Sequence, residues 1–114
     1  MFSEATSFEA FVNVDPQTLY ELGNTVRIVD VREPDEFVGE LGHVRGAILA
    51  PLASVGAAAR AFDPDEPVVV VCRSGGRSAR AAEALCRLGF TKVMNLQGGM
   101  LAWNALRLPV ETAR

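Results

Sequence analysis

Apolar residues along this chain occur in short runs typical of β-strands, and these runs alternate with helical patterns. Four consecutive valines, Val68–Val71, form the strongest strand signal, because no polar residue interrupts them. A strand of this kind is buried on both faces, which implies helices on both sides of a parallel sheet. Other apolar and β-branched runs predict further strands at 11–14, 26–31, 47–52 and Val93–Leu96.

Helical segments separate these strands. Asp15 and Pro16 are typical of an N-cap and a first helical residue, and Gly23 is expected to end that helix. Further helices are expected at 33–37, 53–62 and 77–88 and after the glycine pair 98–99. The alternation predicts an α/β fold whose mostly parallel central sheet has about five strands and is flanked by helices on both faces. The strand at 11–14 is expected at an edge, where it need not be parallel.

Length and composition indicate one globular domain, residues 1–114. The chain has 114 residues, of which 49% are hydrophobic and 22% charged. A net charge of −3 argues against a nucleic-acid-binding protein. Residues 1–10 lack Lys and Arg, and no apolar run is long enough to cross a bilayer, so neither a secretory signal nor a membrane partner is expected. We therefore expect a cytoplasmic protein.

The charge changes sign along the chain at Cys72. Residues 1–71 contain four arginines against twelve Asp or Glu residues, whereas residues 72–114 contain seven Arg or Lys residues against two Glu. Arg73, Arg77 and Arg80 lie close behind Cys72. The sequence therefore predicts a local positive site inside an acidic protein, and such a site would select small anions.

The segment 72–77, CRSGGR, connects the valine strand to the following helix. Open parallel sheets place their ligand sites at this end of a strand. Gly75 and Gly76 allow the backbone to curl, so that its N–H groups and those of the helix N-terminus converge on an anion. These donors, together with the arginines, would lower the pKa of a thiol at Cys72. We therefore predict that Cys72 is a nucleophile in an anion-binding loop, and that Cys86 belongs to the core.

Other polar residues have weaker claims to a functional role. Arg32 either faces the site and helps to hold an anion, braced by Asp30 or Glu36, or forms a structural ion pair. Asp30 is expected to hydrogen-bond the following loop, and the single histidine, His43, is expected to hydrogen-bond the backbone. One histidine and two widely spaced cysteines make no metal site, and no cofactor is expected.

Four motifs, in this order, resemble those of the single-domain rhodaneses, or rhodanese-like sulfurtransferases. They are IVDVR with the following EF, GHVRGA, VVVCRSGGRS, and LQGGM with the following AW, and the resemblance covers about residues 10–108. It implies a rhodanese-like fold in which the Cys72 thiolate takes the outer sulfur of an anionic donor, thiosulfate or a persulfide. The resulting Cys72 persulfide would pass its sulfur to a thiophilic acceptor such as cyanide or a thiol, which a partner protein could carry. The residues expected to bind the substrate are Arg73, Ser74, Gly75, Gly76, Arg77 and Arg32.

Two other functions remain open from the sequence. The fold also hosts inactive versions, so the chain could be a binding or regulatory module, although the retained Cys72, glycines and Arg77 argue against this. A cysteine phosphatase or an arsenate-reductase-like enzyme would use the same nucleophile. The Cys-x5-Arg phosphatase pattern, however, needs an arginine where this chain has Ser78. The six-residue loop from Cys72 to Arg77 resembles that of active sulfurtransferases rather than the longer loop of rhodanese-related phosphatases.

Overall fold

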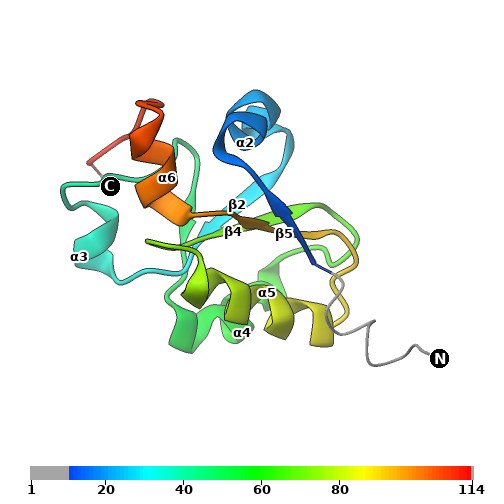
Figure 1. Cartoon of the computed structure of the whole chain (residues 1–114). Helices are drawn as coiled ribbons and strands as arrows, with labels where there is room; N and C mark the ends of the chain where they lie inside the picture. The colour runs from blue at the N-terminus through cyan, green and yellow to red at the C-terminus, as the bar shows by residue number, and fades with distance from the viewer. Residues whose placement is uncertain (1–10, 114) are drawn as a thin grey trace.

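The computed structural model describes residues 11–113, which fold around one five-stranded parallel sheet (Figure 1). The strands are β1 (Val12–Val14), β2 (Arg27–Asp30), β3 (Ile48–Leu49), β4 (Val68–Val71) and β5 (Val93–Leu96). Their order is β1-β5-β4-β2-β3, and every neighbouring pair is parallel. The predicted sheet is therefore confirmed, and its short first strand lies at an edge, parallel to β5.

Helices cover both faces of the sheet, as the valine strand predicts. Figure 1 shows α4 (Val55–Ala58) and α5 (Gly76–Arg87) below the sheet, and α2 (Pro16–Leu22) and α6 (Gly99–Ala105) above it. The short helix α3 (Pro34–Phe37) lies to one side, near the start of α6. Three 3₁₀ turns, Gly23–Thr25, Leu52–Ser54 and Ala59–Ala61, complete the described elements.

The alanine-rich segment 53–62 is the main departure from the predicted elements. Only Val55–Ala58 is α-helical, and a 3₁₀ turn lies on each side of it. Ser54, at the N-cap, makes no side-chain capping bond, and Gly56 lowers the helical propensity inside this short element. Alanine content alone therefore does not extend this helix, because a short helix depends on caps and on packing of one face.

Strand β4 is the centre of the core. All four of its valines are fully buried, with Val68 and Val70 in the apolar cluster on the α4 and α5 face, and Val69 and Val71 in the cluster on the opposite face. Trp103 belongs to this second cluster and donates its indole N–H to the Pro109 carbonyl, 3.0 Å away. Because both faces of β4 are packed, the residue that follows Val71 has a fixed position.

The first turn of α6 packs directly on the loop that follows β4. The N–H groups of Met100 and Leu101 donate to the carbonyl oxygens of Cys72 and Arg73, at 2.9 and 3.0 Å. A Cβ atom at Gly99 would lie 2.5 Å from both of these oxygens, and Gly99 has a φ of +58°. Gly99 therefore permits a close backbone approach, and a side chain at this position would push the loop away from α6.

We expect Gly99→Ala to lower the free energy of unfolding by about 2 kcal/mol, because it introduces both a backbone clash and an unfavourable φ. Urea denaturation followed by circular dichroism measures this change. Gly56→Ala is the matched control, because nothing lies within 4 Å of a Cβ atom at Gly56. That variant should keep or slightly increase the stability, and equal losses in both variants would contradict the packing argument.

Candidate functional site

Cys72 follows β4 directly, and the loop that it begins curls around its sulfur. The residue is buried, and its Sγ accepts a hydrogen bond from the Gly75 N–H at a donor–acceptor distance of 3.0 Å. Gly75 has a φ of 106° and forms the N-cap of α5. This conformation is accessible to glycine, and it aims the backbone N–H back at the cysteine. The Ser78 hydroxyl lies 3.3 Å from the same sulfur, on the first turns of α5.

These donors lower the pKa of the Cys72 thiol. Burial alone raises this pKa, but hydrogen bonds from the Ser78 hydroxyl and from the backbone of Ser78, Gly75 and Ser74 outweigh the effect of burial and bring the pKa below its usual value. The lowered pKa agrees with the expectation from the sequence. Its main cause is the set of hydrogen bonds from loop and helix rather than the arginine charges.

Ser78 also belongs to a chain of polar side chains that crosses the sheet. Its Oγ lies 2.5 Å from Asn95 Oδ1, and Asn95 Nδ2 donates to Asn13 Oδ1 at 3.0 Å. A hydroxyl has one proton, so Ser78 donates it to one of three acceptors within reach: Asn95 Oδ1, the sulfur of Cys72, or the Gly75 carbonyl at 3.2 Å. Sequence reasoning assigned no role to Ser78 or Asn95. The sequence nevertheless contains a signal for both residues, because each is a polar residue within an otherwise apolar pattern. Ser78 lies on the inner stripe of α5 and Asn95 lies in strand β5, and both are buried.

Arg77 forms an ion pair that sequence reasoning missed. Its two terminal nitrogens contact the two carboxylate oxygens of Glu36 at 2.7 and 2.8 Å, which joins α5 to α3. Glu36 also accepts a hydrogen bond from the Glu33 N–H and so completes the capping box of α3. The hydrogen bonds from Arg77 lower the pKa of Glu36 to about 2, against the opposing effect of burial. Glu36 is therefore charged throughout the physiological pH range.

Arg32 is buried and bound to protein groups. Its Nε and Nη2 atoms donate to the Asp30 carboxylate at 2.9 and 2.8 Å, and Nη2 also donates to the Gly42 carbonyl at 2.7 Å. Both side chains of this ion pair are almost fully buried. Asp30 further accepts from the Arg32 N–H, as expected of a residue that hydrogen-bonds the following loop. The geometry is that of a structural ion pair, the second of the two roles considered for Arg32.

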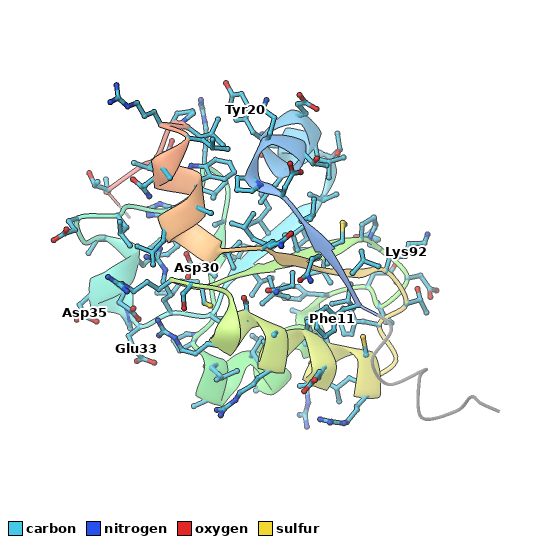
Figure 2. All side chains as sticks on the ribbon, viewed as in Figure 1. Phe11, Tyr20, Asp30, Glu33, Asp35 and Lys92 are labelled. Carbon is cyan, nitrogen blue, oxygen red and sulfur yellow. The ribbon has the colours of Figure 1, made fainter. Side chains whose placement is uncertain are left out.

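A hollow of about 380 Å³ lies beside the cysteine loop. It is lined by Arg32, Asp35, Glu36, Gly39, Glu40, Leu41, Arg73 and Leu101. Figure 2 shows the side chains of Glu33 and Asp35 at this end of the molecule, whereas those of Phe11 and Lys92 lie at the other end. Arg73, the loop residue that lines the hollow, is exposed. The hollow therefore places charged side chains of both signs next to the loop that holds Cys72.

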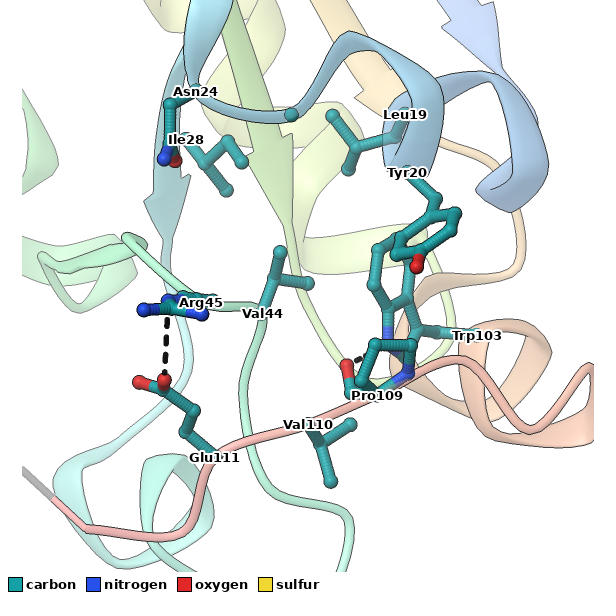
Figure 3. Close-up of a pocket in the computed structure, with 11 residues that line it drawn as sticks. Leu19, Tyr20, Asn24, Ile28, Val44, Arg45, Trp103, Pro109, Val110 and Glu111 are labelled. Atoms are coloured by element: carbon teal, nitrogen blue, oxygen red, sulfur yellow. Dashed lines mark hydrogen bonds and ion pairs between the residues drawn. The ribbon is translucent and has the colours of Figure 1, made fainter.

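A second hollow, of about 310 Å³, lies between α2, α6 and the chain near residue 110 (Figure 3). Leu19, Tyr20 and Trp103 form part of its apolar wall, and an ion pair of 3.6 Å between Arg45 and Glu111 lies at its polar side. No residue of the cysteine loop lines it. Of these two hollows, the first alone is lined by a residue of the cysteine loop, Arg73.

His43 has the structural role expected of it. Its Nδ1 atom hydrogen-bonds the Phe37 carbonyl at 2.7 Å, and its ring stacks on the Phe37 ring. Within residues 11–113, no group of three or more His, Cys, Asp or Glu side chains is placed to hold a metal ion. None of the helices in that same range has the length and apolar character needed to span a membrane.

Comparison with known proteins identifies the family to which these motifs point. A family model described as a rhodanese-like domain matches residues 15–106. The thiosulfate sulfurtransferase GlpE of Pseudomonas aeruginosa is 33% identical over 106 residues, which cover 92% of this chain and 94% of that protein. A crystal structure of a rhodanese-related protein from Thermoplasma volcanium is 28% identical and superposes with a TM-score of 0.82, covering 90% of this chain and all of that one.

Some relatives are longer than this chain. An uncharacterized protein from Synechocystis is 36% identical over 107 residues, which cover 92% of this chain but 59% of the relative. The chain thus spans about three fifths of the length of that relative.

We expect Ser78→Ala to raise the pKa of Cys72. When the hydroxyl donates its proton to the sulfur it favours the charged form of Cys72, so its removal leaves the thiolate less stable and moves deprotonation to higher pH. The pH dependence of the alkylation rate of Cys72 by iodoacetamide measures this change. Thr91→Ala removes an exposed hydroxyl that contacts the Pro64 carbonyl and should leave the profile unchanged. An unmoved midpoint in Ser78→Ala would show that the hydroxyl does not act on the thiolate.

We expect Asp30→Asn to lower the free energy of unfolding by about 3 kcal/mol or more, because it leaves the buried Arg32 cation without its counter-charge. Urea denaturation again gives the value. Glu66→Gln, which removes the partly exposed ion pair with Arg27, is the control and should cost less than about 1 kcal/mol. A similar small loss in both variants would rule out a structural role for the Asp30–Arg32 pair.

Proposed function

Because this chain belongs to the rhodanese-like domain family, we propose that it is a sulfurtransferase that carries a sulfur atom on Cys72. The observation that carries this proposal is the convergence of the Gly75 N–H and the Ser78 hydroxyl on one buried sulfur whose pKa is lowered. Such donors stabilise a thiolate, and a thiolate is the nucleophilic form of cysteine. The same donors would stabilise a negative charge on a second sulfur atom bound to Cys72.

The reaction proceeds in two steps. In the first, the Cys72 thiolate attacks the outer sulfur of the donor, a new S–S bond forms, and the electron pair of the broken bond leaves with the first product. That product is sulfite when the donor is thiosulfate, and a thiolate when the donor is a persulfide. In the second step, a thiophilic acceptor such as cyanide or a thiol attacks the outer sulfur of the Cys72 persulfide and restores the thiolate. This is covalent catalysis with ping-pong kinetics.

The loop supplies binding groups rather than proton donors for this reaction. Backbone groups of Ser74, Gly75 and Ser78 hydrogen-bond the sulfur. Arg73 is an exposed cation on the wall of the hollow. Arg77 lies behind the loop, where its charge interacts with that of Cys72. Arg32 lines the hollow but is already paired, so we assign the anionic part of the substrate to the loop amides and Arg73.

The two alternative functions receive less support from the geometry. A Cys-x5-Arg phosphatase uses an arginine at the position of Ser78, whereas here this position gives a short hydroxyl that contacts the sulfur itself. A catalytically silent module needs no lowered pKa at Cys72 and no donors directed at its sulfur.

We expect the reduced protein to gain the mass of one sulfur atom when it is incubated with thiosulfate or a persulfide. Intact-protein mass spectrometry detects the gain, and cyanide should remove it. Cys72→Ser should gain nothing, whereas Cys86→Ala, which removes the thiol at the C-terminal end of α5, should still gain the sulfur. Absence of an adduct with every donor would refute the proposal, and turnover of a phosphate ester would instead support the phosphatase.

A further inference from the structure

Two arginines near the cysteine loop, Arg77 and Arg32, are paired with carboxylates. Arg77 is bound through both terminal nitrogens to Glu36, and Arg32 is bound to Asp30 in a buried pair. Arg73 is exposed and has no ion pair within the part of the chain that the structure describes. Of the three arginines expected to form a local positive site, Arg77 is therefore paired, whereas Arg73 and the likewise exposed Arg80 have no ion pair within residues 11–113.

The wall of the hollow beside the loop is more acidic than basic. Asp35, Glu36 and Glu40 line it together with the two cations Arg32 and Arg73. Asp35 and Glu40 are exposed, so they add a negative potential at the mouth without forming an ion pair within residues 11–113. An approaching dianion is repelled by this potential more strongly than a donor with a single charge.

The two kinds of sulfur donor differ in the charge that they bring. Thiosulfate carries two negative charges, so three negative charges come together when the Cys72 thiolate attacks it. One of these charges ends on the Cys72 persulfide and two end on sulfite. A persulfide, R–S–S⁻, brings one charge, and its attack ends with the Cys72 persulfide and R–S⁻. Atoms and electrons balance in both reactions without an oxidant or reductant. The smaller total charge suits a site in which the groups that hydrogen-bond the Cys72 sulfur are uncharged amides and a hydroxyl.

Part of the hollow is also suited to the carbon-bearing part of an organic donor. Leu41 and Leu101 line it, and Leu101 is 40% exposed. The volume of about 380 Å³ lies within the range of small-molecule sites. The sulfite part of thiosulfate has no carbon-bearing group that could be buried there, whereas a small organic persulfide has its R group.

We infer that Glu36, by holding Arg77, makes this site selective for low-molecular-weight organic persulfides over thiosulfate. The inference rests on the proposed sulfur transfer and adds its substrate class. Glu36 acts as a specificity-determining residue, because it decides whether the guanidinium of Arg77 is available to a doubly charged donor. Glu36 contacts both terminal nitrogens of Arg77, at 2.7 and 2.8 Å.

The test compares kcat/KM for thiosulfate and for cysteine persulfide, whose amino and carboxylate charges cancel, with cyanide as the common acceptor. We expect the protein to prefer cysteine persulfide. Glu36→Gln should raise the ratio of thiosulfate to persulfide activity about fivefold, the scale of one partly exposed charge pair. Gln keeps an oxygen that can accept the Glu33 N–H, so the cap of α3 is retained.

Two further variants complete the experiment. Glu40→Gln removes an exposed carboxylate of the same hollow and should shift the ratio in the same direction by a smaller factor, even if Glu36→Gln fails to fold. Glu66→Gln removes an ion pair with Arg27, at the start of β2 and thus at the opposite end of the sheet, and should leave the ratio unchanged.

Each outcome separates the inference from the function on which it rests. If both donors transfer sulfur but the protein prefers thiosulfate, the inference is overturned and the sulfurtransferase function stands. The same holds if neither Glu36→Gln nor Glu40→Gln alters the ratio of thiosulfate to persulfide activity. Failure of both donors to transfer sulfur to Cys72 would instead remove the proposed function.

Discussion

The burial of β4 on both faces is the constraint on which the rest of the structure depends. Its four valines contact both apolar clusters, and the strand pairs with β2 on one side and β5 on the other. A strand held from four sides cannot shift along its axis without opening the core. The carboxyl ends of β4, β2 and β5 are consequently held at the same end of the sheet. They lead into the loop after Val71, the Asp30–Arg32 ion pair and the start of α6.

The sulfur at that end is stabilised mainly by dipoles. Backbone N–H groups and one hydroxyl are directed at Cys72, while two of the nearby arginines are engaged with carboxylates. Fixed dipoles need no reorganisation when charge moves from one sulfur to the next, so they suit a reaction in which the anion changes position but not sign. A fully cationic pocket would bind the first product, especially sulfite, more tightly and slow its release.

Sequence patterns predicted the features that depend on neighbouring residues. Val68–Val71 identifies the central strand, Asp15 caps α2 as expected, and the glycines of the loop mark its curl. The side-chain hydrogen bonds around the site join residues far apart in the chain. Arg77 and Glu36 are 41 positions apart, and Asn95 and Asn13 are 82 positions apart. Such contacts depend on how the strands are ordered, which no local spacing encodes. The length of α4 was also not predictable, because it depends on caps and packing rather than on alanine content.

The polar chain from Asn13 through Asn95 and Ser78 to Cys72 connects the rim of the molecule to its reactive atom. Strand β1, which carries Asn13, has three residues and, among the strands within residues 11–113, pairs with β5 alone. A short edge strand opens locally at much lower free energy than the centre of a sheet. An opening that breaks the Asn13–Asn95 hydrogen bond would leave Ser78 as the remaining side-chain partner of the Asn95 amide among the described residues. The polar chain thereby joins a short strand at the side of the sheet to the residue that follows its central strand.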